Sequence, residues 1–262
     1  MTDTSLIFES GAASDVGKVR KVNEDSFLVR AGSGLWCVSD GMGGHEAGRL
    51  ASTMIVEALS TVEPQEAAAG LLSECDRRLS VVNHRLRRIA SDRNYEVVGA
   101  TVVVLLIHGH SYACLWSGDS RIYRVRGGAL TQLTRDHSEA EELVQRGIMT
   151  REEVKHWPRR NVITRAIGVA DLPEVEIVNG SVEPGDSYVL CSDGLTNHVA
   201  DPEIASIVAE FDVQTACDRL VALTLERGAK DNVTVVVARA QRREPTLIDP
   251  GGAAKANWDV GA

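Results

Sequence analysis

"WCVSDGMGGHEAG", residues 36–48, is the stretch that decides the fold, because an apolar run stops there at a carboxylate, Asp40, and glycines follow at once. An Asp-Gly pair is among the strongest turn signals. The same pair is also typical of a place where backbone and carboxylate must both approach a ligand closely. The stretch therefore indicates either a plain turn or a binding site at the end of a strand, and the rest of the chain decides between them.

Further acidic residues stand beside apolar runs in the same way. They are Asp193 in "YVLCSDGL", Asp119 in "CLWSGDSR", Asp231 in "KDNVTVVV", and Glu24 with Asp25 in "VNEDSF". Each alone is typical of a turn or a cap. If sheet packing gathers these strand ends, the carboxylates raise one another's pKa unless cations neutralise them. Oxygen ligands alone favour Mg²⁺ or Mn²⁺ over zinc, so the pattern predicts such a site.

The periodicity of the chain predicts its fold class. Strand-like segments lie at 26–31, 35–39, 100–107, 111–117, 121–126, 187–192 and 233–240, several of them separated by short turns. Apolar residues at steps of three and four predict helices at 46–60 and 66–90, and a third helical region spans 201–227. Runs of strands and runs of helices, without strict alternation, predict an α+β fold with antiparallel sheets covered by helices.

Two segments fall outside this core. Residues 136–167 are polar and partly helical, and we expect them to form an insertion on the rim of the scaffold, a flap. Residues 241–262 lack periodicity and are rich in Gly, Ala and Pro, so we expect a disordered tail. The sequence thus predicts one domain over residues 1–240, followed by this tail.

Composition narrows the classes of function. The chain has 262 residues, 44% of them hydrophobic, a formal net charge of −9 and a pI of about 5.3. This acidic balance argues against nucleic-acid binding and suits a protein that gathers cations. No apolar run approaches the roughly 18 to 20 residues of a membrane span, and no basic leader opens the chain. We therefore expect a cytoplasmic protein that contacts neither nucleic acid nor membrane.

The five cysteines are expected to be small buried hydrophobic residues of a reducing compartment. None forms a C-x-x-C pair, so zinc and disulfide interpretations have no support from spacing. None precedes an arginine at the spacing of a cysteine-phosphatase loop. Cysteine-based phosphate chemistry is therefore excluded.

Five stretches together resemble the ordered motifs of the PPM family, the metal-dependent protein serine/threonine phosphatases of the 2C type. They are "SDVGKVRKVNEDSF", "VSDGMGGHEAG", "SGDSRIYR", "CSDGLTN" and "KDNVTVVV", and the resemblance covers roughly residues 8–240. It implies a four-layer αββα sandwich, two antiparallel β-sheets flanked by helices. The form "DGMGG" and the compact length resemble a bacterial stand-alone catalytic domain.

The resemblance also implies roles for individual residues. Asp40 bridges two metal ions; the Gly41 carbonyl and Glu24 complete one of them, and Asp193 and Asp231 hold the other. Asp119, with Asp193, holds a third, weaker ion. Asp25 orients metal-bound water, Arg20 binds the substrate phosphate, and Asn232 and Arg121 brace loops around the site.

The implied reaction is hydrolysis of phosphoserine or phosphothreonine by direct attack of a hydroxide that bridges Mn²⁺ or Mg²⁺ ions. Many eukaryotic relatives have His after the first Asp-Gly, but here Met42 stands there and cannot donate a proton. Two substitutes remain open, a water on the third ion and His45. The rival hypothesis is a catalytically dead relative that binds phosphoproteins, but no expected metal-binding acid is missing.

The expected partners are phosphorylated proteins, namely a bacterial Ser/Thr kinase and its substrates. We expect the protein to act as a monomer. Nothing in the sequence selects one physiological substrate or pathway.

Overall fold

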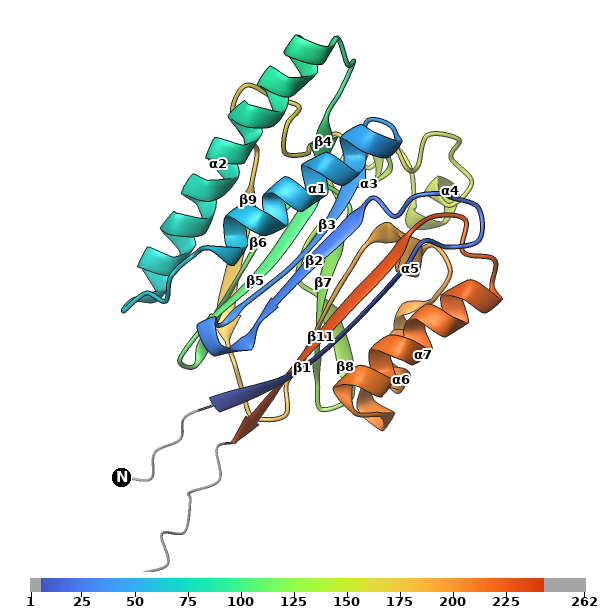
Figure 1. Cartoon of the computed structure of the whole chain (residues 1–262). Helices are drawn as coiled ribbons and strands as arrows, with labels where there is room; N and C mark the ends of the chain where they lie inside the picture. Colours follow the sequence, from blue (N-terminus) through green and yellow to red (C-terminus); the bar gives the residue numbers. More distant parts are fainter. Residues whose placement is uncertain (1–5, 243–262) are drawn as a thin grey trace, which may run out of the picture.

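Two antiparallel sheets stacked face to face form the centre of the molecule (Figure 1). The computed structural model describes residues 6–242. One sheet has the strand order β1 (Leu6–Asp15), β11 (Val233–Arg242), β10 (Ser187–Cys191), β7 (Arg121–Arg126) and β8 (Ala129–Gln132). The other has the order β2 (Asp25–Arg30), β3 (Leu35–Met42), β5 (Val102–His108), β6 (Ser111–Ser117) and β9 (Glu176–Ser181), with β4 (Gly99–Ala100) paired to β3.

Helices cover the outer face of each sheet (Figure 1). Helices α1 (His45–Ser60) and α2 (Ala68–Arg93) pack on the sheet that contains β3. Helices α5 (Asp193–Thr196), α6 (Asp201–Glu210) and α7 (Val213–Glu226) pack on the sheet that contains β11. A short 3₁₀ turn, η1 (Ala31–Ser33), joins β2 to β3. The predicted α+β class and the four-layer αββα sandwich are confirmed.

Strand β3 shows how the sequence builds these layers. Its side chains alternate between two apolar layers, as the period of two in a strand requires. Trp36 and Val38 lie in the core between the sheets, whereas Leu35 and Cys37 lie in the core beneath the helices. A strand buried on both faces reads as a continuous apolar run, which is why "LWCVS" signals its place so clearly. All five cysteines are buried and free, as expected.

The structure departs from the predicted elements in several places, among them the short helix α5 and the division of the predicted strand 100–107 into β4 and β5. Strands β1, β8 and β9 were not predicted, because their exposed and small residues weaken the apolar alternation. The helical region 201–227 is two helices. The first ends at Glu210, because Phe211 is extended, and Asp212 caps α7 by accepting from the Gln214 and Thr215 amides at 3.1 and 3.0 Å. Strand β11 runs to Arg242, two residues into the expected tail. The rest of that expected tail, 243–262, lies outside the described residues.

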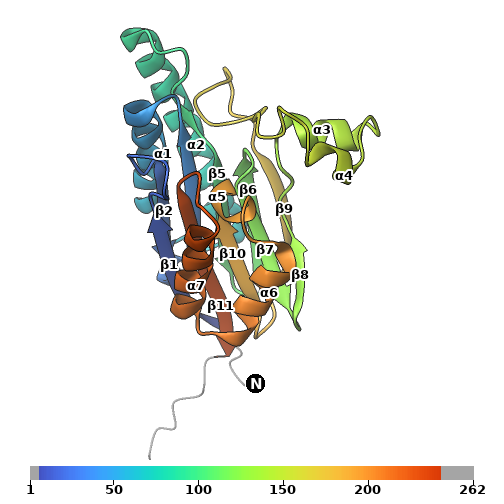
Figure 2. The same cartoon turned by 90° about the vertical axis from the view of Figure 1, so that its right-hand side faces the viewer.

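The flap segment 136–167 carries two short helices, α3 (Glu139–Gln145) and α4 (Arg151–Val154). Figure 2 shows them standing away from the helical layers at one end of the sandwich. Within residues 6–242, no helix is long and apolar enough to cross a membrane.

Candidate active site

The acidic residues at the strand ends gather around one cavity of about 370 Å³. Its lining includes seven of the eight residues predicted for the site, namely Arg20, Glu24, Asp40, Gly41, Asp119, Asp193 and Asp231. The eighth, Asp25, is buried with only 8% of its surface exposed, and it is the direct cross-strand partner of Asp40. The sequence-based grouping of distant carboxylates therefore corresponds to one place in the fold.

Both sheets contribute to this cavity. Asp25 and Asp40 face each other on β2 and β3 of one sheet. Asp193 begins α5 directly after β10, and Asp231 precedes β11, so both come from the other sheet. Asp119 lies in the turn between β6 and β7, which belong to different sheets. Like charges opposite each other on a strand pair are destabilising, so Asp25 and Asp40 are a costly placement without a cation.

The Asp25 carboxyl is held from one side only. Its Oδ2 accepts hydrogen bonds from the Ser192 and Thr234 hydroxyls at 2.8 and 2.7 Å. Its Oδ1 is buried and makes no hydrogen bond. Burial raises the pKa of Asp25 to about 7, the two hydroxyls oppose that rise, and nearby Asp193 and Asp231 add to it. An unpartnered buried carboxylate oxygen is costly, so the site calls for another partner there.

The neighbouring carboxyls of Asp40, Asp119 and Asp193 also have raised pKa values. Burial raises the pKa of Asp40 well above its ordinary value, and Asp25, Asp193 and Asp119 raise it further. The pKa of Asp119 rises for similar reasons, and its buried Oδ1 also has no hydrogen-bond partner. Burial and Asp231 raise the pKa of Asp193 to about 6, although the Asn197 amide donates to it at 3.0 Å. Together these acids place an excess of negative charge in the cavity, and each makes ionisation of the others less favourable.

Arg20 supplies a cation in the lining of this cavity. Its guanidinium donates to Asp231 Oδ2 at 2.7 Å, and this pair raises the pKa of Arg20. The sequence assigned Arg20 to a substrate phosphate and Asp231 to a metal, so it did not predict that the two would pair. The Arg20 and Asp231 side chains are 46% and 37% exposed, so solvent screens the pair and Arg20 has room to turn toward a ligand.

The glycines of the opening stretch have a packing role that the sequence did not reveal. A Cβ on Gly41 would lie 2.1 Å from the Gly48 carbonyl oxygen, because the first turn of α1 presses on β3 there. A Cβ on Gly48 would in turn lie 2.1 Å from Glu24 Oε2. These two glycines therefore let α1, β3 and the Glu24 carboxylate approach one another at the rim of the cavity.

Asn232 braces the loop that carries Arg20 and Glu24. Its side-chain oxygen accepts from the Glu24 amide at 2.8 Å, and its amide group donates to the carbonyls of Val16 and Val22 at 2.9 and 3.1 Å. This is the loop-bracing role expected for it.

Proton donors are scarce in the cavity. Met42 lines it and offers no proton. The side chain of His45, the candidate acid named from the sequence, lies outside the described part of the structure. Burial raises the pKa of the nearby Cys191 thiol to about 12, so no thiolate forms there at neutral pH.

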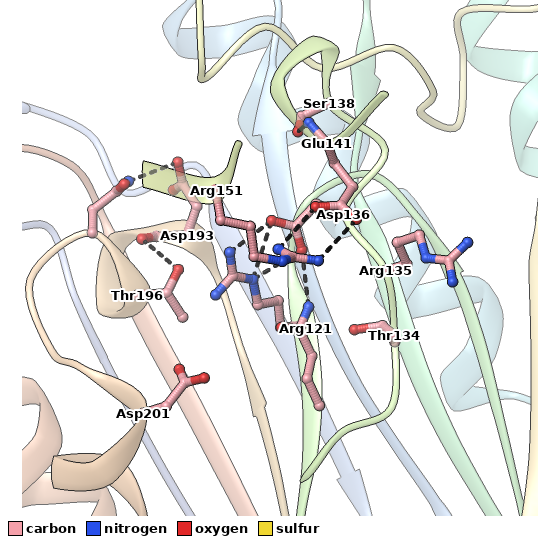
Figure 3. Close-up of polar contacts among 12 residues, drawn as sticks. Arg121, Thr134, Arg135, Asp136, Ser138, Glu141, Arg151, Asp193, Thr196 and Asp201 are labelled. Atoms are coloured by element: carbon pink, nitrogen blue, oxygen red, sulfur yellow. Dashed lines mark hydrogen bonds and ion pairs between the residues drawn. The ribbon is translucent and has the colours of Figure 1, made fainter. Parts of the chain in front are cut away.

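A second cavity of about 300 Å³ adjoins the first on the flap side. Asp119, Asn161 and Asp193 line both, and flap residues Arg151 and Arg160 line the second only. Figure 3 shows the ion pairs around it: Arg121 holds Asp136 through two nitrogens at 2.9 and 2.7 Å, and Arg151 holds Glu141 at 3.2 Å. Arg121 therefore braces the base of the flap, in agreement with the loop-bracing role expected for it.

The donor set fits divalent cations. The cavity offers carboxylates and a glycine carbonyl, which are the ligands that Mg²⁺ and Mn²⁺ prefer, and two buried carboxylate oxygens stand without partners. Among the described side chains, no three Asp, Glu, His or Cys groups are already arranged to hold one ion. Because like charges repel, we expect these carboxylates to turn toward a common point only when a cation joins them.

The αββα sandwich and an acidic cavity that offers oxygen ligands are the features expected of the metal-dependent phosphatases of the 2C type. The family model described as protein phosphatase 2C matches residues 18–233, so the chain belongs to this family and the resemblance seen in the sequence is confirmed.

Individual relatives agree with this assignment. The serine/threonine protein phosphatase PstP of Mycobacterium tuberculosis is 37% identical over 239 residues, which are 91% of this chain and 46% of PstP. The chain thus spans about half the length of that curated relative. The structure of PppA, a key regulatory component of T6SS in Pseudomonas aeruginosa, is 41% identical and superposes with a TM-score of 0.85, covering 91% of this chain and 100% of PppA. The catalytic domain of PstP in complex with two manganese ions is 35% identical, with a TM-score of 0.82 over 90% of this chain and 100% of that domain.

Several site residues escaped sequence reasoning. Ser192 and Thr234, which hold Asp25, each stand inside or beside an apolar strand, and a buried hydroxyl in such a run was the available signal. Asn161 and Ile163 of the flap line the acidic cavity. No local sequence pattern predicts that these two residues line the cavity, because their position depends on how the flap folds back toward the sheets.

Proposed function

We propose that this protein hydrolyses phosphoserine and phosphothreonine in other proteins and requires Mn²⁺ or Mg²⁺. The observation that supports this most strongly is the convergence of the acidic residues on one cavity with two unpartnered buried oxygens. Among the described lining residues there is no Cys, Ser or His side chain that could attack phosphorus. Because we assign the carboxylates of the cavity to the ions, we propose water as the nucleophile, with no covalent phosphoenzyme.

We assign the ions to the residues that the sequence indicated. Asp40, shared by both ions, would hold one with the Gly41 carbonyl and Glu24, and the other with Asp193 and Asp231. We propose that Asp119, together with Asp193, holds a third. When bound, such ions lower the pKa of water and offset the charge of a phosphoryl group.

The remaining steps belong to side chains of this chain. Asp25 Oδ1 is free to accept a hydrogen bond from the attacking water, while Ser192 and Thr234 fix its carboxylate through Oδ2. Arg20 is exposed enough to leave Asp231 and bind two phosphate oxygens through its planar fork. Asp231 would lose this counter-ion when Arg20 turns, and a divalent cation held by Asp231 would offset the loss.

We further propose that the protein acts as a monomer in the cytoplasm and opposes a Ser/Thr kinase by acting on that kinase or its substrates. The five buried free cysteines suit a reducing compartment. The names of the relatives support a phosphoprotein substrate class.

Phosphate release from a phosphothreonine peptide tests the proposal. We expect release with Mn²⁺ or Mg²⁺ and none after chelation, and we expect Asp40→Asn to abolish it. Asp76→Asn is the matched control, because Asp76 is an exposed residue of α2 that does not line the cavity. Full release in chelator would refute the metal-dependent mechanism, and tight peptide binding with no release would favour the dead-relative hypothesis.

A further inference from the structure

A buried histidine at the base of the flap contacts the residue that precedes Asp119. His137 is only 5% exposed, and its Nδ1 accepts a hydrogen bond from the Gly118 amide at 3.2 Å. The His137 amide donates back to the Gly118 carbonyl at 2.9 Å. One residue of the flap therefore holds both backbone polar groups of Gly118.

The surroundings of His137 fix its ring. The imidazole stacks on Trp116, with ring centroids 5.9 Å apart and planes 20° apart. Its Nε2 lies 3.3 Å from Glu176 Oε1, which also accepts from Arg165 at 2.7 Å. Burial and the Arg165 charge lower the pKa of His137, which favours the neutral ring. The Nε2 proton then points to Glu176, and Nδ1 is left free to accept.

The conformation of Gly118 requires glycine. Its φ of +116° is a conformation that L side chains rarely adopt, and a Cβ there would lie 2.6 Å from the Thr101 side chain. Its amide is buried, so loss of the Nδ1 acceptor would leave an unsatisfied donor at that point. A shift of Gly118 would move Asp119, the next residue, whose carboxyl lines both cavities.

His137 also ties this turn to the return of the flap. Its carbonyl accepts from the Thr164 amide at 2.8 Å, and the neighbouring Ser138 pairs with Ile163 across an isolated bridge. Ile163 lines the acidic cavity. The two ends of the flap and the Asp119 turn thus meet at His137, through its backbone on the flap side and through its backbone and imidazole at Gly118.

We propose that His137 is a positioning residue: by holding the Gly118 amide, its imidazole sets the direction of the Asp119 carboxylate and couples the base of the flap to the active site. This inference relies on the proposed phosphatase function only for its activity readout. Residues that orient a metal-binding side chain typically contribute about 10- to 100-fold to activity or metal affinity, and we expect an effect of that size.

Two variants separate hydrogen bonding from packing. His137→Phe keeps an aromatic ring on Trp116 and removes the acceptor, whereas His137→Asn places a carbonyl oxygen near the former Nδ1. We expect His137→Phe to lower kcat about tenfold or more with little change in KM, and His137→Asn to recover most of the loss. His156→Phe, the same change at an exposed flap histidine, is the matched control and should behave as wild type.

Two further measurements exclude a merely structural role. In an Asp119→Ala background, His137→Phe should cost less than about twofold, because both changes act through one carboxylate. Amide hydrogen exchange at Gly118 should accelerate in His137→Phe and return toward the wild-type rate in His137→Asn, whether or not the protein is active.

The outcomes are separable. An inactive wild type would refute the phosphatase proposal, and the exchange rates would still decide whether His137 holds Gly118. An active wild type with unchanged His137→Phe turnover, or with the same fold loss in both backgrounds, would overturn the positioning role. Unchanged Gly118 exchange in His137→Phe would overturn it as well.

Discussion

Replacing Asp25 by Asn should stabilise the protein in chelator, although it removes a residue of the site. The pKa of Asp25 is raised from 3.8 to about 7, so the folded state binds its proton more tightly than the unfolded state does. The favourable contribution of such a group is present below pH 3.8 and is lost as the pH rises through 7. At pH 8 the ionised carboxylate therefore opposes folding.

The magnitude follows from this difference in pKa. At about 1.4 kcal/mol per pKa unit, a rise from 3.8 to about 7 corresponds to about 4 kcal/mol at most. Because neighbouring acids share the effect, we expect Asp25→Asn to gain about 1 to 3 kcal/mol at pH 8 and less at pH 5. The Asn carbonyl can still accept from Ser192 and Thr234, so the two hydrogen bonds survive.

Thermal unfolding in chelator at pH 5 and pH 8 measures the gain. For a domain of this size, we expect Tm to rise by roughly 3 to 10 °C at pH 8. Saturating Mn²⁺ should stabilise the wild type more than the variant and so reduce the difference in Tm between them. Asp186→Asn is the contrasting control: Asp186 is 1% exposed and pairs with Arg126 at 2.6 Å, so its loss should lower Tm in both conditions. A variant less stable than wild type in chelator at pH 8 would refute the view that the cavity carries unbalanced charge.

Three other predictions concern catalysis. Asp40→Asn should lower turnover of a phosphothreonine peptide by about a thousandfold or more, since the residue is assigned to both ions, and activity within threefold of wild type would contradict that assignment. Asp119→Ala should slow a phosphoserine peptide far more than an aryl phosphate, because an aryl oxide leaves without help from an acid; equal slowing would point to another role. Arg160→Ala, in the flap-side cavity, should alter rates on phosphoproteins more than on a small aryl phosphate, and equal losses would mean that the flap supports the core instead.

The sequence predicted the acidic cluster because chemistry and position coincide there. Asp40 and Asp193 each stand where an apolar run of the sequence stops, and a charge at such a point is visible without a structure. The sequence could not show that Arg20 pairs with Asp231, since that contact joins residues 211 positions apart. It also could not show that Gly41 packs against the first turn of α1, because that contact depends on the folded structure.

Strands at the margins of the sheets were the hardest part of the fold to predict. Strand β9 is half exposed, with every second residue at the surface, and its polar residues make its sequence resemble that of a loop. His137 escaped notice for a similar reason. A single histidine in a polar segment carries no periodic signal, and its importance arises from Gly118, Trp116 and Glu176, which lie elsewhere in the chain.

The pairing of β1 with β11 makes the first strand depend on the last. Leu6 lies opposite Arg242 and Asp15 opposite Val233, and β11 alone separates β1 from β10 in the sheet. While the chain leaves the ribosome, β1 has no partner until residues 233–242 emerge, and Asp231 arrives at the same late moment. A nascent chain therefore carries a complete acidic cavity only when synthesis of the domain is nearly finished, so the order of synthesis itself delays the onset of the proposed activity.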